Sequence, residues 1–470
     1  MKSNRTFKNT VIYGLAPQIT KALSVAVLPF ITPYLTTTDY GVAGVVMAVT
    51  AAISIFSTLG LAYILMLYYY KSPSQYKWIW REVYGFLRIW QIFFAIIQSF
   101  ILYFFLPPEA DDNFFLISGL LGLPFVIFSA SSFIGFNLYR FKENAIGTAY
   151  KTIVAALAII ILNILTIRYM KLGYLGWFIS MAVSDVLLNA LYYFPLKFKY
   201  KLSPIYNFKR KTIREVIKKS LPLLPHYYSI YLLEISDRVV MKILNVPTPL
   251  IGKYNVAATF GSYFSNFHMA VGNAIGPAIF SALKKQDYQE VKKSLIPYFY
   301  LTLALTFTFG CWAKEIVSFL FRNEDFNTLY ILSIGIVMAY NYRPYYILVN
   351  QYLSYNEKVK YLPYVTFVPG VLNVILNFVF IPLYGLSAAV ISTLICYTLM
   401  GFAPFLFSKI QNLLHFSYNV LVSFMAMAIL TILAYLATDL TWLLKSIINI
   451  SVFLFLYILS KKLIHEKYTI

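Results

Sequence analysis

The chain has 470 residues, of which 60% are hydrophobic and 19% aromatic but only 12% charged. Soluble globular proteins carry about 25% charged residues, so this chain has too little polar surface to fold with water on all sides. Its net charge is +21, but a mean hydropathy of +0.69 indicates a polytopic membrane protein rather than a nucleic-acid-binding protein. We expect the lipid bilayer, and no nucleic acid, among its partners.

The apolar segments predict an all-α integral membrane protein with about 14 transmembrane helices, since one crossing needs about 20 apolar residues. The first segment is too long for a signal-peptide core, so we expect it to be retained as a span. The spans are expected at about 10–34, 41–66, 84–106, 114–138, 146–167, 173–194, 220–245, 252–281, 294–313, 329–352, 361–381, 384–407, 417–437 and 441–460.

Basic residues concentrate in alternate loops, most densely between Lys197 and Lys219. Lys and Arg remain on the cytoplasmic side of a membrane. The opposite loops carry few of them: Arg168, Lys171, Lys253, Lys314 and Arg322. The charge pattern therefore predicts an even number of spans with both termini in the cytoplasm.

An internal repeat appears when the chain is aligned with itself at an offset of 214 residues. The offset pairs Glu143 with Glu357 and the run 161–163 with 375–377, and a further shift of five residues pairs Gly176 with Gly385. Six spans return the chain to the same side, so we expect two parallel six-helix lobes around a central cavity. The predicted domains are an N-terminal lobe (1–196), a basic cytoplasmic linker (197–219), a C-terminal lobe (220–408), and two further helices with a tail (409–470).

Ionisable residues inside predicted spans are candidates for function, because a charge at mid-membrane costs about 2.5–3.5 kcal/mol. They are Lys21, Asp185, Glu234, Asp237, Arg238, Lys242 and Arg343, accompanied by His226 and His268. In a continuous helix, Glu234, Arg238 and Lys242 share one face, and Tyr227 and Tyr231 extend it.

Three of these cations suggest a cavity for an anion. Lys21 and Arg343 have no carboxylate nearby in the sequence, and the planar fork of arginine suits a diphosphate. Simpler interpretations stay open: Glu234 and Arg238 form an intrahelical pair, Lys242 extends to the interface, Asp185 is a satisfied core carboxylate, and the histidines are packed. Cys311 and Cys396 have no metal-ligand or disulfide spacing, so we expect no metal site.

Several short motifs together resemble a known family, although none of them is specific alone. They are Tyr13-Gly14, Lys21, Leu28-Pro29, Leu35, Asp39-Tyr40-Gly41, Gly173 to Gly176, Ser236-Asp237-Arg238, Ile251-Gly252-Lys253-Tyr254, Ala257, Asn273 to Pro277, and Tyr384-Gly385. In order and spacing the chain resembles the Wzx-type polysaccharide or O-antigen repeat-unit flippases of the multidrug/oligosaccharidyl-lipid/polysaccharide exporter superfamily.

This resemblance implies a MATE-like, two-lobed transporter in the bacterial cytoplasmic (inner) membrane. It implies alternating access that moves an undecaprenyl-diphosphate-linked repeat unit to the periplasmic leaflet, for O-antigen, lipopolysaccharide, capsule or exopolysaccharide. A polysaccharide polymerase and a chain-length regulator are expected partners. The family's cationic cavity corresponds to Lys21 and Arg238 here, and Arg343 is our own extension from the residues.

Two further sets of residues complete the expected site. Tyr227, Tyr231, Asn255, Asn266, Asn273 and His268 are expected to face the glycan. Glu234, Asp237 and Asp185 are candidates for coupling to a proton or Na⁺ gradient, and no other cofactor is expected.

Three alternatives remain. A lipid II flippase has more arginines in its first spans than the single Lys21, and a multidrug/cation antiporter often has a coupling carboxylate in the N-terminal lobe, where this chain offers only Asp185. A membrane polysaccharide polymerase or ligase usually has a large outer loop, whereas the longest outer connection here has about 15 residues. We therefore do not expect an enzyme. No phosphate-binding GxxxxGK[ST] loop occurs, so we do not expect ATP-driven transport either.

Overall fold

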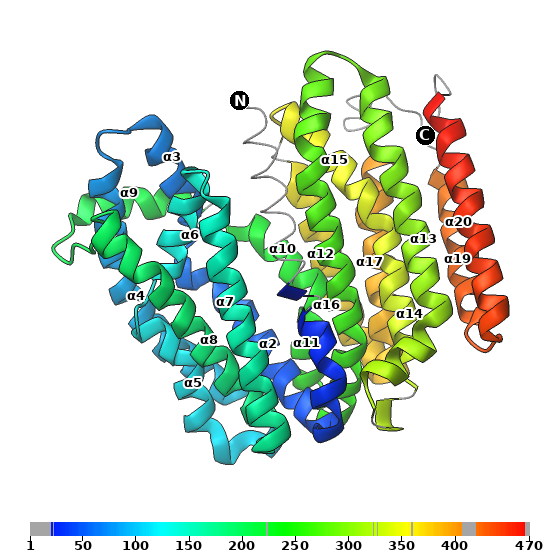
Figure 1. Ribbon diagram of the computed structural model, residues 1–470, viewed down its shortest axis with the longest axis horizontal. Coiled ribbons are helices and arrows are strands. Elements are labelled where there is room, and N and C mark those ends of the chain that lie inside the picture. The colour runs from blue at the N-terminus through cyan, green and yellow to red at the C-terminus, as the bar shows by residue number, and fades with distance from the viewer. Residues whose placement is uncertain are drawn as a thin grey trace. The chain divides into compact units, whose positions relative to one another are not determined.

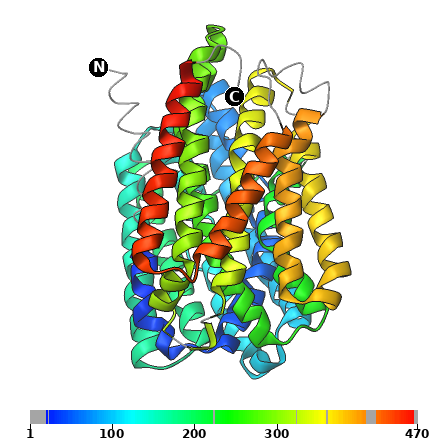
Figure 2. The same cartoon turned by 90° about the vertical axis from the view of Figure 1, so that its right-hand side faces the viewer.

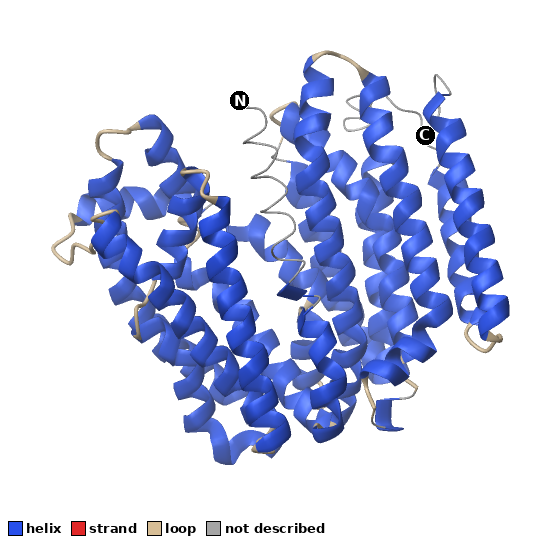
Figure 3. Cartoon of the chain, viewed as in Figure 1, coloured by secondary structure: helices blue, strands red, loops and turns tan. Residues whose placement is uncertain are grey.

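The computed structural model describes residues 20–21, 23–221, 224–322, 324–326, 328–358, 361–406 and 420–465. Within these ranges every regular element is a helix and none is a strand (Figure 3). Eight helices are long and apolar enough to cross a membrane, and a ninth span results if the bent pair Pro108–Val126 and Ser131–Phe141 counts as one. The helices Leu23–Tyr34 and Leu421–Ala437 are apolar but shorter. The predicted all-α membrane architecture is confirmed, and the exact number of fourteen spans stays a prediction.

The chain forms two compact units, which are described separately. Unit 1 comprises Met1–Tyr231 and Asn245–Gly252, and unit 2 comprises Leu232–Leu244 and Lys253–Ile470. Two helices, α10 (Leu224–Glu234) and α12 (Thr248–Lys284), therefore contribute residues to both units. The lobe boundaries expected from the sequence stay a prediction.

Unit 1 contains helices α2 to α9 and most of α10 (Figure 1). Their bounds are η1 Thr32–Tyr34, α2 Thr37–Thr58, α3 Ala62–Lys71, α4 Tyr76–Phe105, η2 Pro108–Asn113, α5 Phe114–Val126, α6 Ser131–Phe141, α7 Ala145–Asn163, η3 Ile164–Tyr169, α8 Tyr174–Phe194, η4 Pro195–Lys199 and α9 Arg210–Ser220.

The basic segment 197–219 is held against unit 1 rather than hanging free. Ile213 and Val216 of α9 are buried in the same hydrophobic cluster as Trp80 of α4. Two hydrogen bonds to Arg81 fix the irregular segment that precedes α9. Arg81 Nε donates to the Ser203 carbonyl at 2.9 Å, and the Arg81 carbonyl accepts from the Ile205 N–H at 2.9 Å. The basic side chains of α9 thus lie on the face opposite its buried residues.

The span predicted at 114–138 bends by 44° between α5 and α6. Pro124 removes one helical hydrogen bond, and Phe128 and Ala130 have positive φ angles of 50° and 59°. Asn189 of α8 compensates by donating to the Pro124 carbonyl at 3.1 Å and accepting from the Ser132 N–H at 3.0 Å. A neighbouring side chain therefore satisfies the backbone that the break frees, as a membrane interior requires.

Unit 2 contains α11 and most of α12, followed by the remaining helices of the chain. Their bounds are α11 Ser236–Ile243, α13 Tyr288–Leu320, η6 Glu324–Phe326, α14 Tyr330–Ala339, η7 Tyr340–Tyr342, α15 Arg343–Tyr355, α16 Leu362–Tyr384, α17 Leu386–Leu406, α19 Val420–Ala437 and α20 Trp442–His465. The last two helices, α19 and α20, pack against α13 (Figures 1 and 2).

The backbone corrects one pair of the internal repeat. Gly173 precedes α8 with φ 53° and ψ −132°, and Gly385 precedes α17 with φ 64° and ψ −146°. Only glycine adopts this region readily. Gly173 is therefore the structural equivalent of Gly385, and the expected pairing with Gly176 was wrong, because Gly176 lies inside the first turn of α8.

Candidate functional site

The charged segment expected as one span at 220–245 is broken at Ile235, between α10 and α11. Two side chains take up the carbonyls near the break: Ser236 Oγ donates to the Leu232 carbonyl at 2.6 Å, and Arg238 Nη1 donates to the Glu234 carbonyl at 2.9 Å. The prediction that Glu234, Arg238 and Lys242 form one helical stripe was wrong, because it assumed a continuous helix.

The Glu234 carboxylate pairs with Arg343, the first residue of α15. Arg343 Nη1 lies 2.5 Å from Glu234 Oε1, and the two side chains are 7% and 15% exposed. Ser265 Oγ donates to both carboxylate oxygens, at 2.9 and 3.0 Å, and the Tyr397 hydroxyl donates to Oε1 at 3.3 Å. The alternative of an intrahelical Glu234–Arg238 carboxylate pair was therefore wrong, and Arg343 has the carboxylate that its sequence neighbourhood lacks.

Aromatic rings enclose the Arg343 guanidinium. Its Cζ lies 5.9 Å from the ring centroids of Tyr340 and Tyr397 and 6.0 Å from that of Tyr346. The faces of such rings attract a cation, most strongly where water is excluded. The ion pair is thus buried among three tyrosines, one each from η7, α15 and α17.

Arg238 is buried too, with 8% exposure, but its contacts are neutral. Its Nε donates to Asn255 Oδ1 at 3.0 Å, and its Cζ lies 5.7 Å from the Tyr254 ring. Among the described residues, no carboxylate lies within ion-pairing distance of it. Since a guanidinium has five N–H donors, Arg238 keeps donors for a further acceptor.

Asp237 lies beside Arg238 and is 2% exposed. Its carboxylate accepts a hydrogen bond from Asn377 Nδ2 at 2.6 Å and another from the Tyr254 hydroxyl. Asn377 also donates to Asn373 Oδ1 at 3.1 Å. The first turn of α11 favours a negative charge here, so Asp237 is a buried carboxylate whose hydrogen-bond partners are neutral.

Sequence reasoning missed most partners in this cluster. Asn373 and Asn377 lie four residues apart within one apolar span, a spacing that places two amides on one helical face. Asn377 was already marked by the repeat, which pairs it with Asn163. Ser265 and Tyr397 gave no comparable signal, because serines and tyrosines are spread through all the helices.

Several predicted site residues lie elsewhere. Lys21 is half-buried and belongs to unit 1, so a cavity shared with Arg238 and Arg343 stays a prediction. Asp185 is exposed on α8, which contradicts its alternative interpretation as a satisfied core carboxylate. Lys242 is half-buried. The side chains of His226 and Tyr227 lie outside the described residues.

The expected glycan-facing residues fall into different environments. Asn273 is exposed on α12, and Asn266 is half-buried and donates to the Ser262 carbonyl at 2.6 Å. Tyr231 is only 9% exposed. His268 is fully buried, with Nδ1 2.6 Å from the Tyr298 hydroxyl, so it does not lie on an accessible wall in this conformation.

The described residues contain no group of three His, Cys, Asp or Glu side chains placed to hold a metal ion. Cys311 and Cys396 are both buried and form no disulfide.

Known proteins resemble this chain in fold and in sequence pattern. A lipid II flippase, MurJ, in an inward closed conformation superposes with a TM-score of 0.70 at 14% identity, covering 97% of this chain and 100% of that one. An outward-facing multidrug resistance MATE family transporter of the MOP superfamily gives 0.56 at 13% identity, over 86% and 96%. A MOP superfamily transporter from Pyrococcus furiosus, reported with a binding pocket of reversed polarity, gives 0.54 at 11% identity, over 87% and 96%.

These identities show a shared fold alone, that of the MOP superfamily transporters. No curated protein sequence matches the chain significantly. The family model "Polysaccharide biosynthesis protein" matches residues 6–283, which is more than half of the chain. The chain therefore belongs to the polysaccharide biosynthesis protein family, in agreement with the resemblance of its motifs.

Proposed function

We propose that this protein is a flippase for a polyprenyl-diphosphate-linked oligosaccharide repeat unit, which it moves from the cytoplasmic to the periplasmic leaflet by alternating access. Membership of the polysaccharide biosynthesis family supports the glycan, and the likeness to MurJ and MATE transporters supports the transport. The carrying observation is the pair of buried arginines, Arg238 and Arg343, on either side of Glu234. In this proposal the protein lies in the bacterial cytoplasmic membrane with both termini inside, and a polymerase and a chain-length regulator act on the flipped unit.

Arg238 is the first contact for the diphosphate, because its hydrogen-bond partners are neutral and it retains free donors. A phosphate offers charge-assisted hydrogen bonds that Asn255 cannot match. The family resemblance implies Lys21 as a further cation for the substrate. Arg343 binds the diphosphate only after a phosphate replaces the Glu234 carboxylate as its partner. One buried anion then replaces another, so the guanidinium always has a counter-ion.

The sugars contact polar side chains of α12, where Asn273 is exposed and Asn266 half-buried. Both residues lie on the same helix as Asn255, which is the hydrogen-bond partner of Arg238. A glycan attached to a diphosphate at Arg238 would therefore meet amides that donate and accept hydrogen bonds.

Asp237 is the best supported of the three candidates for ion coupling. Glu234 is already neutralised by Arg343, and Asp185 is exposed on α8. Asp237 is buried next to Arg238, and a carboxylate with an amide and a hydroxyl suits a proton or an oxygen-bound cation such as Na⁺. Neutralising Asp237 removes the anion nearest to Arg238, which then attracts the diphosphate more strongly.

A complementation experiment tests the proposal. Cells that lack their own repeat-unit flippase receive the wild type, R238Q, or the control R322Q, which removes an exposed arginine of the same unit. We expect R238Q to lower surface glycan by at least about tenfold, since a buried arginine–phosphate contact amounts to more than about 1.4 kcal/mol. R322Q should retain wild-type levels. Full activity of R238Q would remove Arg238 from the mechanism.

Vesicle transport measures the coupling separately. We expect imposed proton or Na⁺ gradients to accelerate transport by the wild type but not by D237N, which keeps the shape of the side chain without its charge. Transport by the wild type that ignores both gradients would refute the coupling role of Asp237 and leave the flippase proposal intact.

A lipid II flippase is the second candidate, favoured by the fold match to MurJ over nearly the whole chain. The same vesicles distinguish the two substrates when they are loaded either with lipid II or with an undecaprenyl-diphosphate-linked repeat unit. Preferential transport of lipid II would establish the second candidate. A multidrug antiporter would instead move cations and ignore both lipids.

A further inference from the structure

A buried lysine in unit 1 is surrounded by tyrosine rings. Lys151 lies on α7 and is 7% exposed. Its Nζ lies 4.4 Å from the ring centroid of Tyr139 and 5.3 Å from that of Tyr192, and it donates a hydrogen bond of 3.5 Å to the Gly147 carbonyl. Within the described ranges no carboxylate lies at ion-pairing distance. Burying an ammonium group is costly unless an anion accompanies it.

Close contacts with two glycines fix the positions of the Tyr139 and Tyr192 rings. A Cβ added to Gly135 of α6 would lie 2.3 Å from the Tyr192 ring, and one added to Gly147 would lie 2.7 Å from the Tyr139 ring. Only glycine leaves room for the rings at these two positions. Tyr139 and Tyr192 also contact each other edge-on, with centroids 5.5 Å apart. The aromatic environment of Lys151 is therefore determined by α6, α7 and α8 together.

Two more lysines gather on a third ring next to this pair. The Nζ atoms of Lys142 and Lys199 lie 4.8 and 5.7 Å from the centroid of Tyr200, and Tyr200 contacts Tyr139 at 5.7 Å. Both lysines are exposed. Three ammonium groups on three connected rings repel one another, and an anion placed among them would offset that repulsion.

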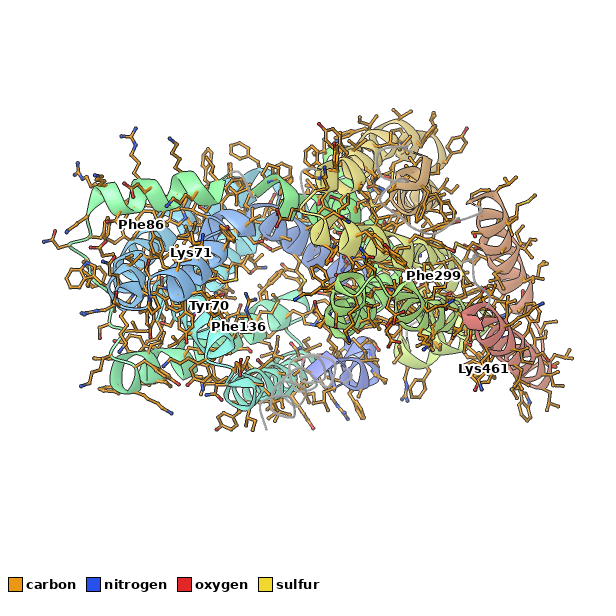
Figure 4. All side chains as sticks on the ribbon, turned by 90° about the horizontal axis from the view of Figure 1, so that it is seen from above. Tyr70, Lys71, Phe86, Phe136, Phe299 and Lys461 are labelled. Atoms are coloured by element: carbon orange, nitrogen blue, oxygen red, sulfur yellow. The ribbon has the colours of Figure 1, made fainter. Side chains whose placement is uncertain are left out.

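Exposed aromatic rings lie close to Lys199 in the sequence, and Lys197 lies over one of them, with its Nζ 5.3 Å from the Phe198 centroid. Phe194 and Phe198 are 51% and 68% exposed and stack on each other, with centroids 6.4 Å apart. Phe136 of α6, labelled in Figure 4, is 40% exposed. Phosphate bound at the lysines would thus have hydrocarbon-binding surface next to it, which suits a lipid and not a free ion. The charge pattern places this end of the helices at the cytoplasmic leaflet, where anionic lipids are found.

We infer that Lys142, Lys151 and Lys199, with Tyr139, Tyr192 and Tyr200, form a binding site for the phosphate headgroup of an anionic phospholipid. The exposed pair contacts the phosphate directly, and Lys151 adds its charge from beneath the rings. The site lies in unit 1 and does not depend on the transported substrate, so it stands even if the proposed function fails.

Native mass spectrometry of the purified full chain tests the site. The protein is titrated with phosphatidylglycerol and, separately, with phosphatidylcholine of the same acyl chains. We expect the wild type to prefer phosphatidylglycerol and the double variant K142Q/K199Q to bind it about tenfold more weakly, with phosphatidylcholine unchanged. The matched control K461Q/K462Q removes two exposed lysines from α20, one of which, Lys461, also lies over a tyrosine ring, at 4.9 Å from Tyr457 (Figure 4).

The control should keep the wild-type preference. Unchanged phosphatidylglycerol binding by K142Q/K199Q would overturn the inference, and so would an equal loss in both double variants, which would indicate only a general charge effect. A third titration uses undecaprenyl diphosphate. If it displaces phosphatidylglycerol from the wild type but not from K142Q/K199Q, the site belongs to the transported lipid and the inference is wrong. Failure of that displacement supports the phospholipid.

Discussion

Buried cations of this protein are held in two ways. In unit 2, Arg343 pairs with Glu234, and Lys445 of α20, which is fully buried, lies 2.5 Å from Glu315 of α13. Arg238 of the same unit has neutral hydrogen-bond partners instead. Unit 1 surrounds Lys151 with tyrosine rings, and none of its described carboxylates lies at ion-pairing distance from the ammonium group. An ion pair has no net charge, whereas a ring-held ammonium keeps its charge and attracts anions. Burial of a cation therefore does not by itself distinguish a structural group from a binding group, but its partner does.

Breaking the Glu234–Arg343 pair should have the largest effect. E234A leaves the Arg343 guanidinium buried without its anion, which we expect to cost about 3–5 kcal/mol of unfolding free energy. The thermal unfolding midpoint in detergent measures the loss. The double variant E234L/R343L should recover most of the stability, because hydrophobic replacements of a buried pair are often neutral. A midpoint for E234A within error of the wild type would show that the pair is not structural.

Filling the space beside the Tyr192 ring should cause the second-largest loss of unfolding free energy. G135A places a methyl group against Tyr192, and we expect a loss of about 2–3 kcal/mol, in the upper range for overpacking. The phosphatidylglycerol preference should fall with it, since Tyr192 is displaced from Lys151. The matched variant G119A has no heavy atom within 4 Å of the new Cβ and should leave both measurements unchanged. Normal stability of G135A would contradict the tight contact.

Lys445 should matter less than Glu234, although it is more deeply buried. K445M leaves Glu315, whose side chain is 46% exposed and can be hydrated, and it leaves the Thr438 carbonyl without its 2.8 Å donor. We expect a loss of about 1–2 kcal/mol, close to that for one unsatisfied buried acceptor. Thermal unfolding again provides the measurement. A loss as large as that of E234A would mean that partner exposure does not set the cost.

Lys151 should show the smallest effect on stability. K151M leaves no carboxylate unpaired, and the lost cation–π attraction is offset by removing a poorly hydrated charge, so we expect a change within about 1 kcal/mol. Phosphatidylglycerol binding should weaken in the same protein. A loss of 3 kcal/mol or more would instead indicate a strong ionic partner and would remove the contrast between Lys151 and the ion-paired Arg343 and Lys445.

Much of the fold could be predicted from the sequence because hydropathy is a local property. Each expected span in the described ranges overlaps one helix or a helix pair, and the span expected at 84–106 overlaps the long helix α4. The break at Ile235 could not be predicted, since no proline or glycine marks it. It depends on Ser236 and Arg238, which satisfy the freed carbonyls and are common elsewhere in helices.

The candidate site could be predicted only in its charged members. The membrane's penalty for charge identified Glu234, Asp237, Arg238 and Arg343 from sequence alone. Their pairing could not be read, because Glu234 and Arg343 are 109 residues apart and spacing along one helix suggested Arg238 instead. Lys445 was missed for a related reason: it lies near the start of a predicted span, where lysines usually extend to water.

Glu234 contacts the two arginines through different atoms, its carboxylate for Arg343 and its main-chain carbonyl for Arg238. Replacing the side chain alters only the first contact, because every amino acid has the same carbonyl. Natural variation at position 234 can therefore change the ion pairing of Arg343 without changing the hydrogen bond that positions Arg238. A substitution at this single codon would change how strongly Arg343 is neutralised in a related transporter and would leave the hydrogen bond of Arg238 in place.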